Sequence, residues 1–125
     1  MRVVVSTSSS TPIYEQIKDQ VRSSILSGEI QAGQALPSLR QLAADLRVSI
    51  ITVTRAYNDL AAEGLVRSEH GRGFVVLAVD PEIARAALQE RVDDVLRELR
   101  IAARHARLST SDIHHRLDET WRNDD

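Results

Sequence analysis

The stretch from Leu36 to Val76 most constrains the fold, because two short helical patterns and a pair of strand-like segments follow one another there. Ser38 and Ser49 each precede apolar residues at helical spacing, and a serine hydroxyl in that position satisfies N–H groups at a helix start. Gln41, three residues after Ser38, predicts a capping box. Arg47 and Val48 leave room for only a tight turn. The stretch therefore predicts a helix-turn-helix.

The second of these helices has a clear inner face and is followed by a hairpin. Gly64 closes the helix, and segments 65–67 and 74–76 are typical of paired strands around a tip at residues 69–73. This order is typical of a winged helix-turn-helix, in which one helix enters the DNA major groove and the ribbon reaches the backbone or minor groove. The predicted inner face consists of Val53, Ala56, Tyr57 and Leu60.

An earlier helix is expected between Thr11-Pro12 and Gly28, with one apolar face of isoleucine and valine at every fourth position. Val3–Val5 is β-prone and predicts a small strand ahead of a flexible Ser/Thr tract. The fold class expected is mainly α with a small β-wing. An N-terminal winged helix-turn-helix, residues 11–76, would be followed by a short C-terminal helical dimerisation tail, residues 80–122.

The tail begins at Asp80-Pro81 with a long helix whose apolar residues recur at a near-heptad spacing. Such a seam should not stay exposed to water, so we expect a homodimer. A last helix, capped by Ser109 and carrying Ile113, Leu117 and Trp121, should cover part of the seam within one chain. The residues expected at the dimer interface are Leu88, Val92, Val95, Leu99 and Ala102.

Composition excludes several classes of protein. The chain lacks cysteine, which rules out disulfides and thiolate metal sites, and it has no apolar run of membrane-spanning length, so we expect a cytoplasmic protein without a membrane partner. Residues 1–76 carry 8 Lys/Arg and 7 Asp/Glu, a net +1, whereas residues 77–125 carry 8 and 11, a net −3. DNA affinity would therefore depend on where charges are placed and on dimerisation.

The start of the predicted recognition helix carries the candidate base contacts. Ser49 and Thr52 could donate to phosphate or a base edge, and Thr54 and Arg55 fall on the same outward face. Two adjacent isoleucines, Ile50 and Ile51, would suit thymine methyl groups. The alternative is that one isoleucine packs inward and the other is an incidental surface residue.

Basic residues nearby complete this surface. Arg40, in the first turn of the preceding helix, is expected to reach a guanine or a phosphate, unless it pairs with Asp45 or Glu63. Arg72, between two glycines at the wing tip, suits a narrow minor groove, although an ordinary hairpin turn has the same pattern. His70 could donate to phosphate. The hydroxyl of Tyr14 could do the same, with a core tyrosine as the alternative.

Catalysis, cofactors and metals have no support in the sequence. His114 and His115 are adjacent and would point about 100° apart on a helix, so they do not share a metal readily. No nucleophile elbow, no phosphate loop and no paired carboxylates in an obvious pocket-forming context are present. We therefore expect no enzyme activity, no cofactor and no metal.

Several ordered segments resemble the GntR family of bacterial transcriptional regulators, and the Ala-Tyr pair at residues 56–57 and the short tail resemble its YtrA subfamily. The segments are Pro12–Ile17, Leu36–Arg40, Thr52–Tyr57, Glu63–Val66 and His70–Val75. The resemblance implies a winged-helix homodimer that binds a palindromic operator, usually as a repressor and often near genes for membrane transporters. By position, the family's DNA contacts fall on Arg40, Ser49, Thr52, Thr54, His70 and Gly71, with Arg72 beside them.

Two features of this chain differ from the broader family. Ile50-Ile51 stands where related members have polar residues or proline, so a different operator is expected. The tail is too short for the effector domain of larger members, and a small-molecule effector, if one exists, would bind at the dimer interface. A fragment of a pyridoxal-phosphate fusion regulator is disfavoured, because the only lysine is Lys18. The rival function is a winged-helix protein-interaction module without DNA binding.

Overall fold

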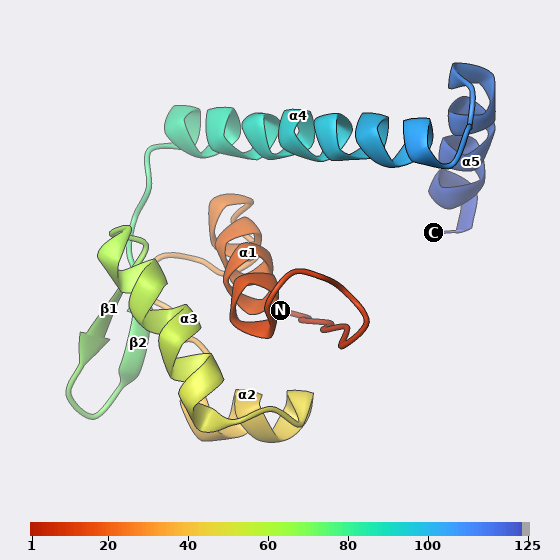
Figure 1. The fold of residues 1–125 in the computed structure, drawn as a ribbon. Helices are drawn as coiled ribbons and strands as arrows, with labels where there is room; N and C mark the ends of the chain where they lie inside the picture. Colours follow the sequence, from red (N-terminus) through yellow and green to blue (C-terminus); the bar gives the residue numbers. More distant parts are fainter. Residues whose placement is uncertain (124–125) are drawn as a thin grey trace. The chain divides into compact units, whose positions relative to one another are not determined.

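The computed structural model describes residues 1–123 and forms two compact units, Met1–Leu88 and the chain from Gln89 on (Figure 1). The observed fold is mostly helical with one two-stranded antiparallel sheet, as the sequence predicts. None of the described helices is long and apolar enough to cross a membrane. The elements in chain order are α1 (Ile13–Leu26), α2 (Leu39–Leu46), α3 (Ile50–Ala62), β1 (Val66–Glu69), β2 (Gly73–Val76), α4 (Pro81–His105) and α5 (Thr110–Asn123).

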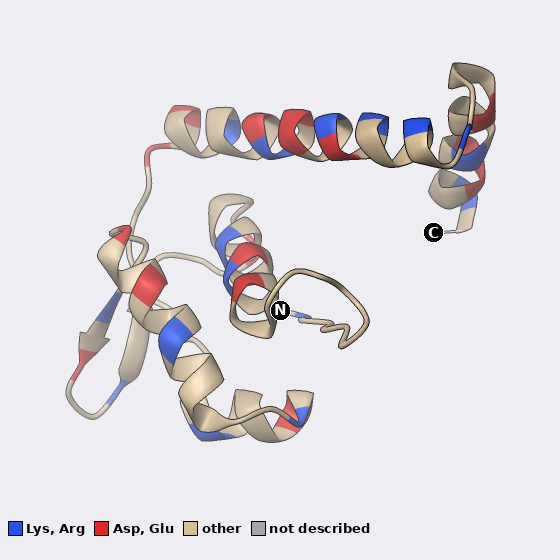
Figure 2. Ribbon diagram, viewed as in Figure 1, with Lys and Arg blue, Asp and Glu red and all other residues tan. Residues whose placement is uncertain are grey.

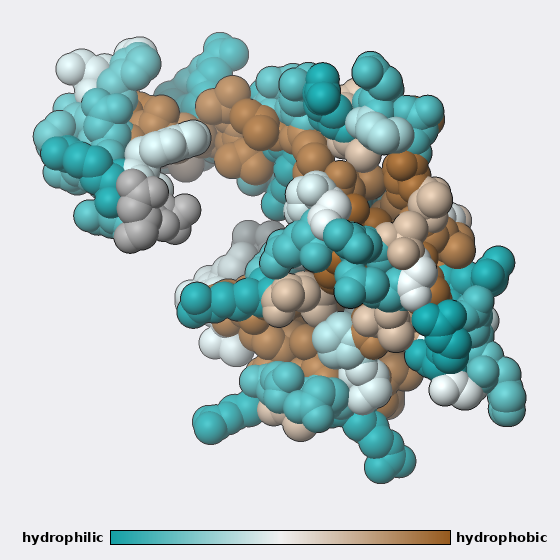
Figure 3. Space-filling view, turned by 180° about the vertical axis from the view of Figure 1, so that it is seen from behind, coloured by the Kyte–Doolittle hydropathy of each residue, from teal (hydrophilic) through white to brown (hydrophobic). Residues whose placement is uncertain are grey.

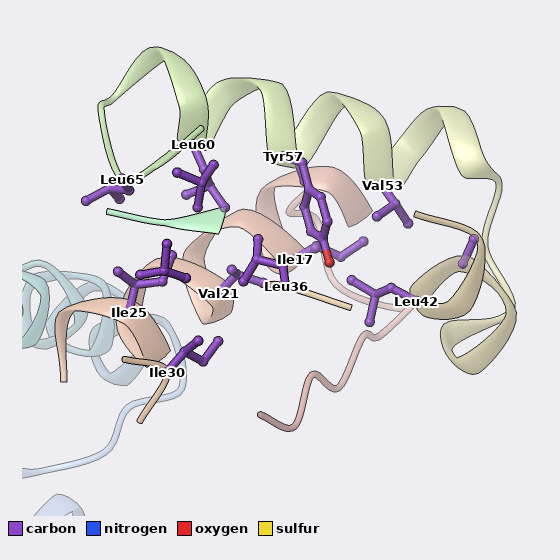
Figure 4. Packing of buried hydrophobic residues seen from close by; sticks show 14 residues of the cluster. Ile17, Val21, Ile25, Ile30, Leu36, Leu42, Val53, Tyr57, Leu60 and Leu65 are labelled. Atoms are coloured by element: carbon purple, nitrogen blue, oxygen red, sulfur yellow. The ribbon is translucent and has the colours of Figure 1, made fainter. Parts of the chain in front are cut away.

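The first unit is built around the inner face of α3. Val53, Tyr57 and Leu60 are fully buried, and their side chains point toward residues of α1 and of the segment that precedes α2 (Figure 4). The Tyr57 hydroxyl donates to the carbonyl of Pro37 at 2.8 Å. Burial of a large apolar side chain contributes about 1.5–3 kcal/mol to the free energy of folding. The inner-face residues that the periodicity of α3 predicts therefore supply much of the stability of the core.

The starts of α2 and α3 are capped as predicted, with one difference. The Ser38 hydroxyl accepts from the Gln41 backbone N–H at 3.0 Å, and the Ser49 hydroxyl accepts in the same way from Thr52 at 3.1 Å. The Gln41 side chain does not complete the capping box, because it donates instead to Asp45 at 2.8 Å. A capping box would need the Gln41 side-chain oxygen to accept from the Ser38 N–H, whereas the contact that forms is donation by the amide nitrogen to a carboxylate one helical turn away.

The wing pairs over a longer stretch than the sequence predicted. β1 and β2 are antiparallel, with Val66 opposite Val76 and Glu69 opposite Gly73. The pairing continues past the predicted strand ends to a tip of three residues. A bridge between Ala35 and Val75 joins the hairpin to the chain that leads into α2. The wing is therefore tied to the helix-turn-helix on one side of β2.

The N-terminal residues form no strand, so the prediction for Val3–Val5 was wrong. The backbone of Val4 exchanges two hydrogen bonds with the Gln20 side-chain amide, at 2.9 and 2.7 Å. Ser6 makes the corresponding pair with Gln16, at 2.8 and 2.9 Å. Val3 and Val5 pack against the core. Side-chain amides of α1 therefore satisfy this extended segment, and no partner strand is needed.

In the second unit α5 is well capped but poorly packed. The Ser109 backbone N–H donates to Asp112 at 2.8 Å, the Asp112 N–H donates back to the Ser109 hydroxyl at 3.1 Å, and the first contact lowers the pKa of the Asp112 carboxyl. No residue of α5 is buried, and Trp121 is 74% exposed. The expectation that this helix covers the seam was wrong for Leu117 and Trp121, which face solvent. Only Ile113 is partly buried.

Candidate nucleic-acid interface

The start of α3 presents apolar side chains to solvent. Ile51 is 81% exposed and Ile50 is 45% exposed, so the alternative in which one of them packs inward does not hold. Large apolar residues on an exposed helix start are costly unless they meet a partner surface. The buried residues of α3 fix this orientation, because Val53 and Tyr57 hold the opposite face in the core.

The hydroxyl groups of the same turn are engaged within the helix. The hydroxyls of Ser49 and Thr52 lie 2.8 Å apart, and the Thr54 hydroxyl donates to the Ile50 carbonyl at 2.8 Å. Ser49 also accepts from the helix backbone, so its first role is to cap α3. These oxygens keep lone pairs with which to accept a hydrogen bond. Donation to DNA would require Thr54 to leave its carbonyl partner.

Arg40 is exposed and pairs with neither of the carboxylates that the sequence offered as alternatives. Asp45 accepts from Gln41, and Glu63 binds Arg22 through two hydrogen bonds of 2.9 and 2.7 Å. Among residues 1–123 the structure gives Arg40 no ion-pair partner. The N–H donors of its guanidinium therefore remain available to an external acceptor.

Arg55 has a partner that sequence reasoning missed. Its guanidinium carbon lies 3.6 Å from the centre of the Tyr14 ring, so α1 and α3 meet through a cation–π contact at the edge of the interface. The two residues are far apart in sequence, and no local pattern signals the contact. Tyr14 is half-buried, so its exposure lies between that of a core tyrosine and that of a tyrosine whose hydroxyl is free to contact a phosphate.

The wing tip differs from the expectation of a free arginine. Arg72 donates to a Glu69 carboxylate oxygen at 3.0 Å and to the Gly33 carbonyl at 2.8 Å. Glu69 also accepts from Arg67 at 2.9 Å, and that hydrogen bond is the main reason why the pKa of the Glu69 carboxyl is lowered. Gly71 has φ +80°, which permits the tight tip. His70 is exposed beside it. The tip is thus held against the loop before α2.

The predicted seam on α4 is largely open. Val92, Val95 and Leu99 are exposed, as is Ala102, whereas Leu88 is half-buried within the first unit. Apolar side chains gather along α4 when the molecule is viewed from behind (Figure 3). Charged residues of both signs alternate along the helix (Figure 2). This face of α4 is therefore open to solvent in the single chain.

Two further features bear on the binding of metal ions and small molecules. Among residues 1–123, no cluster of three histidine, cysteine or carboxylate side chains could hold a metal ion. A hollow of about 640 Å³ lies within the first unit, between the end of α1 and the start of α4. Its lining is mainly apolar. The effector pocket expected from sequence would instead lie between two copies of the chain.

Comparisons with known proteins identify the family. Residues 13–76 match the bacterial regulatory proteins of the gntR family. The chain is 33% identical to the transcriptional repressor YtrA of Bacillus subtilis over 121 residues, which cover 94% of this chain and 90% of that protein. Such relatives are transcription regulators and not enzymes, as the sequence predicted.

Solved structures agree with this assignment. YtrA of Sulfolobus acidocaldarius, described as a GntR-family transcription factor, has a TM-score of 0.58 and 37% identity, covering 75% of this chain and 96% of that chain. The DNA-binding domain of AraR in complex with operator ORX1 has a TM-score of 0.54 and 32% identity, covering 61% and 95%. The chain is a winged helix-turn-helix transcriptional regulator and belongs to the GntR family.

Proposed function

We propose that the protein is a repressor that binds a palindromic operator as a homodimer in the cytoplasm. The observations that carry the proposal are the exposed Ile50 and Ile51 at the start of α3 and the exposed, unpaired guanidinium of Arg40 at the start of α2. An apolar pair and a charged donor on successive helices suit a DNA major groove, which presents thymine methyl groups on its floor and phosphates along its edges. Family membership supports the same reading.

The surface that we propose for DNA contact combines α3, the start of α2 and the wing tip. Base contacts fall on the isoleucines and Arg40, whereas the hydroxyl residues and the wing fix the position of the protein on the backbone. Arg55 joins this surface in the orientation that Tyr14 gives it. The full set is Arg40, Ser49, Ile50, Ile51, Thr52, Thr54, Arg55, His70, Gly71 and Arg72.

Dimerisation is proposed through the α4 seam of Leu88, Val92, Val95, Leu99 and Ala102. The exposed large apolar side chains on α4 support it, because a near-heptad seam without a partner costs solvation free energy. A two-fold dimer would bind two half-sites on one duplex, which makes the operator a palindrome. The subfamily resemblance adds the proposal that the regulated operon encodes a membrane transporter.

A footprint on the DNA upstream of the gene tests the proposal. The wild-type protein should protect a palindrome, and Arg40→Ala should weaken protection by tenfold or more, the effect of about 1–3 kcal/mol expected for a bidentate contact. Arg72→Ala should flatten the salt dependence of binding. Arg116→Ala, which removes the same charge from exposed α5, serves as the control and should behave as wild type.

The footprint also separates the two functions. A footprint unaffected by both changes would contradict the proposed DNA surface. A folded dimer that protects no sequence would favour the rival function, in which the Ile50-Ile51 surface binds a protein partner.

A further inference from the structure

Arg47 adopts an unusual backbone conformation in the turn between α2 and α3. Its φ of 57° and ψ of 46° lie in the left-handed region, where the Cβ of any residue other than glycine is crowded. Among residues 1–123, the only other non-glycine residue with positive φ is Arg107, at φ 58°, between α4 and α5. Both turns thus place an arginine where glycine would fit without strain.

The fold requires this backbone conformation at position 47. The Arg47 N–H donates to carbonyls at the end of α2, and the Val48 N–H donates to Ala43 at 3.0 Å. These bonds close α2 and start the approach to Ser49, the cap of α3. The left-handed residue is therefore part of the helix-turn-helix geometry itself.

The fold does not require an arginine side chain there. Arg47 is exposed, and the structure gives it no hydrogen bond from its guanidinium and no ion pair within residues 1–123. The nearby carboxylate of Asp45 accepts from Gln41 instead. The guanidinium of Arg47 is therefore available to a partner outside residues 1–123.

We propose that Arg47 binds a DNA phosphate beside the recognition helix, as a positioning contact that does not depend on sequence. It lies two residues before Ser49, next to the helix start proposed to enter the groove. A long cation without an internal partner fits a phosphate there, and arginine matches phosphate geometry well. This inference rests on the proposed function and adds a residue that neither the sequence pattern nor the resemblance assigns.

The test compares Arg47→Gly with Arg107→Gly, which is a matched control. Each variant loses one positive charge and gains glycine in a left-handed turn, so both should have a Tm equal to or above that of wild type. On a duplex that the wild-type protein binds, Arg47→Gly should weaken binding by about tenfold. It should also make the negative slope of log K against log salt shallower by about 0.9. Arg107→Gly should leave both within error.

Two more variants keep the result interpretable. Arg47→Lys should retain the salt slope, and Arg47→Gln should lose it while it keeps the strained backbone of the parent. Wild-type affinity and slope in Arg47→Gly, or equal losses in Arg47→Gly and Arg107→Gly, would overturn the role of Arg47 alone. A wild-type protein that binds no duplex would overturn the proposed function, and this inference with it.

Discussion

The guanidinium of Arg55 stacks on the ring of Tyr14, with 3.6 Å between the guanidinium carbon and the ring centre. The contact joins the outer edge of α3 to the start of α1. A planar cation over an aromatic ring loses rotational freedom and keeps its N–H groups directed outward at the rim. The first helix therefore orients a side chain of the proposed DNA surface.

Substitutions of Tyr14 should separate stacking from hydroxyl contact. Tyr14→Phe keeps the ring, so we expect operator affinity within about twofold of wild type. Tyr14→Leu removes the ring, so the free energy of operator binding should weaken by about 0.5–1 kcal/mol, which is about what an exposed cation–π contact is worth. Titration of a labelled operator followed by fluorescence anisotropy measures both. Equal losses in the two variants would mean that the hydroxyl contacts DNA and that stacking is incidental.

Ile51 should read thymine through its methyl group. In a selected operator, uracil in place of the contacted thymine removes only that methyl and should weaken wild-type binding. Ile51→Ala should bind the thymine and uracil duplexes equally. Because Ile51 is 81% exposed, the substitution should change the free energy of unfolding by less than about 0.5 kcal/mol. A uracil effect that persists in Ile51→Ala would assign the methyl contact to another residue.

Glu69 should restrain non-specific binding through the wing. Its carboxylate, like that of any solvent-accessible glutamate, is ionised at neutral pH, and it accepts from both Arg67 and Arg72. Glu69→Gln removes that charge and releases both arginines, so affinity for random-sequence DNA should rise and its salt dependence should steepen. Glu119→Gln, on α5, is the control for total charge. Binding isotherms at several salt concentrations test this, and an unchanged or weaker affinity in Glu69→Gln alone would contradict it.

Two apolar residues of α4 provide a paired test of dimerisation. Val92 and Ile101 are 57% and 56% exposed. They are nine residues apart, which is about half a turn of helix phase at about 100° per residue. Val92→Glu should therefore yield monomers with weakened operator binding, whereas Ile101→Glu should remain dimeric. Sedimentation velocity measures the oligomeric state directly. Dissociation by Ile101→Glu but not Val92→Glu would place the interface on the other face of α4.

Tyr57 should make the domain sensitive to alkali. Burial raises the pKa of its hydroxyl, so the folded state retains a proton that the unfolded state releases above about pH 10. The protonated Tyr57 hydroxyl therefore contributes fully to the free energy of unfolding below that pH. As pH rises further, the free energy of unfolding should fall by at most about 1.4 kcal/mol per pH unit. Tyr57→Phe should remove this slope.

At neutral pH the same variant should cost about 1–3 kcal/mol, because the carbonyl of Pro37 loses its donor. Urea unfolding across pH 7–11 checks both effects. An alkaline slope in Tyr57→Phe as steep as in wild type would assign the sensitivity to other groups.

The recognition helix was predictable because its signals are local. Val53, Tyr57 and Leu60 repeat with helical spacing, and Ser49 supplies the cap within the same stretch of chain. These features predicted both the buried face and, by subtraction, the exposed isoleucines. The position of Arg40 followed in the same way from the cap at Ser38.

The contacts that sequence reasoning missed join distant segments. Arg72 meets Gly33, and Arg55 meets Tyr14, across long separations in the chain. The docking of the N-terminal residues by Gln16 and Gln20 depends on tertiary placement too. Local pattern gives the face of a helix, but it does not give which neighbour a long polar side chain reaches. Gln41 illustrates this even within one helix, because Asp45 competes for its amide.

Selection from randomised duplexes at near-physiological salt tests the central claim most directly. The purified wild-type protein should enrich a palindrome whose half-sites contain thymine at the positions that Ile50 and Ile51 contact. Val92→Glu should enrich single half-sites or nothing. A folded, dimeric wild-type protein that enriches no sequence would contradict a DNA-reading function for this surface.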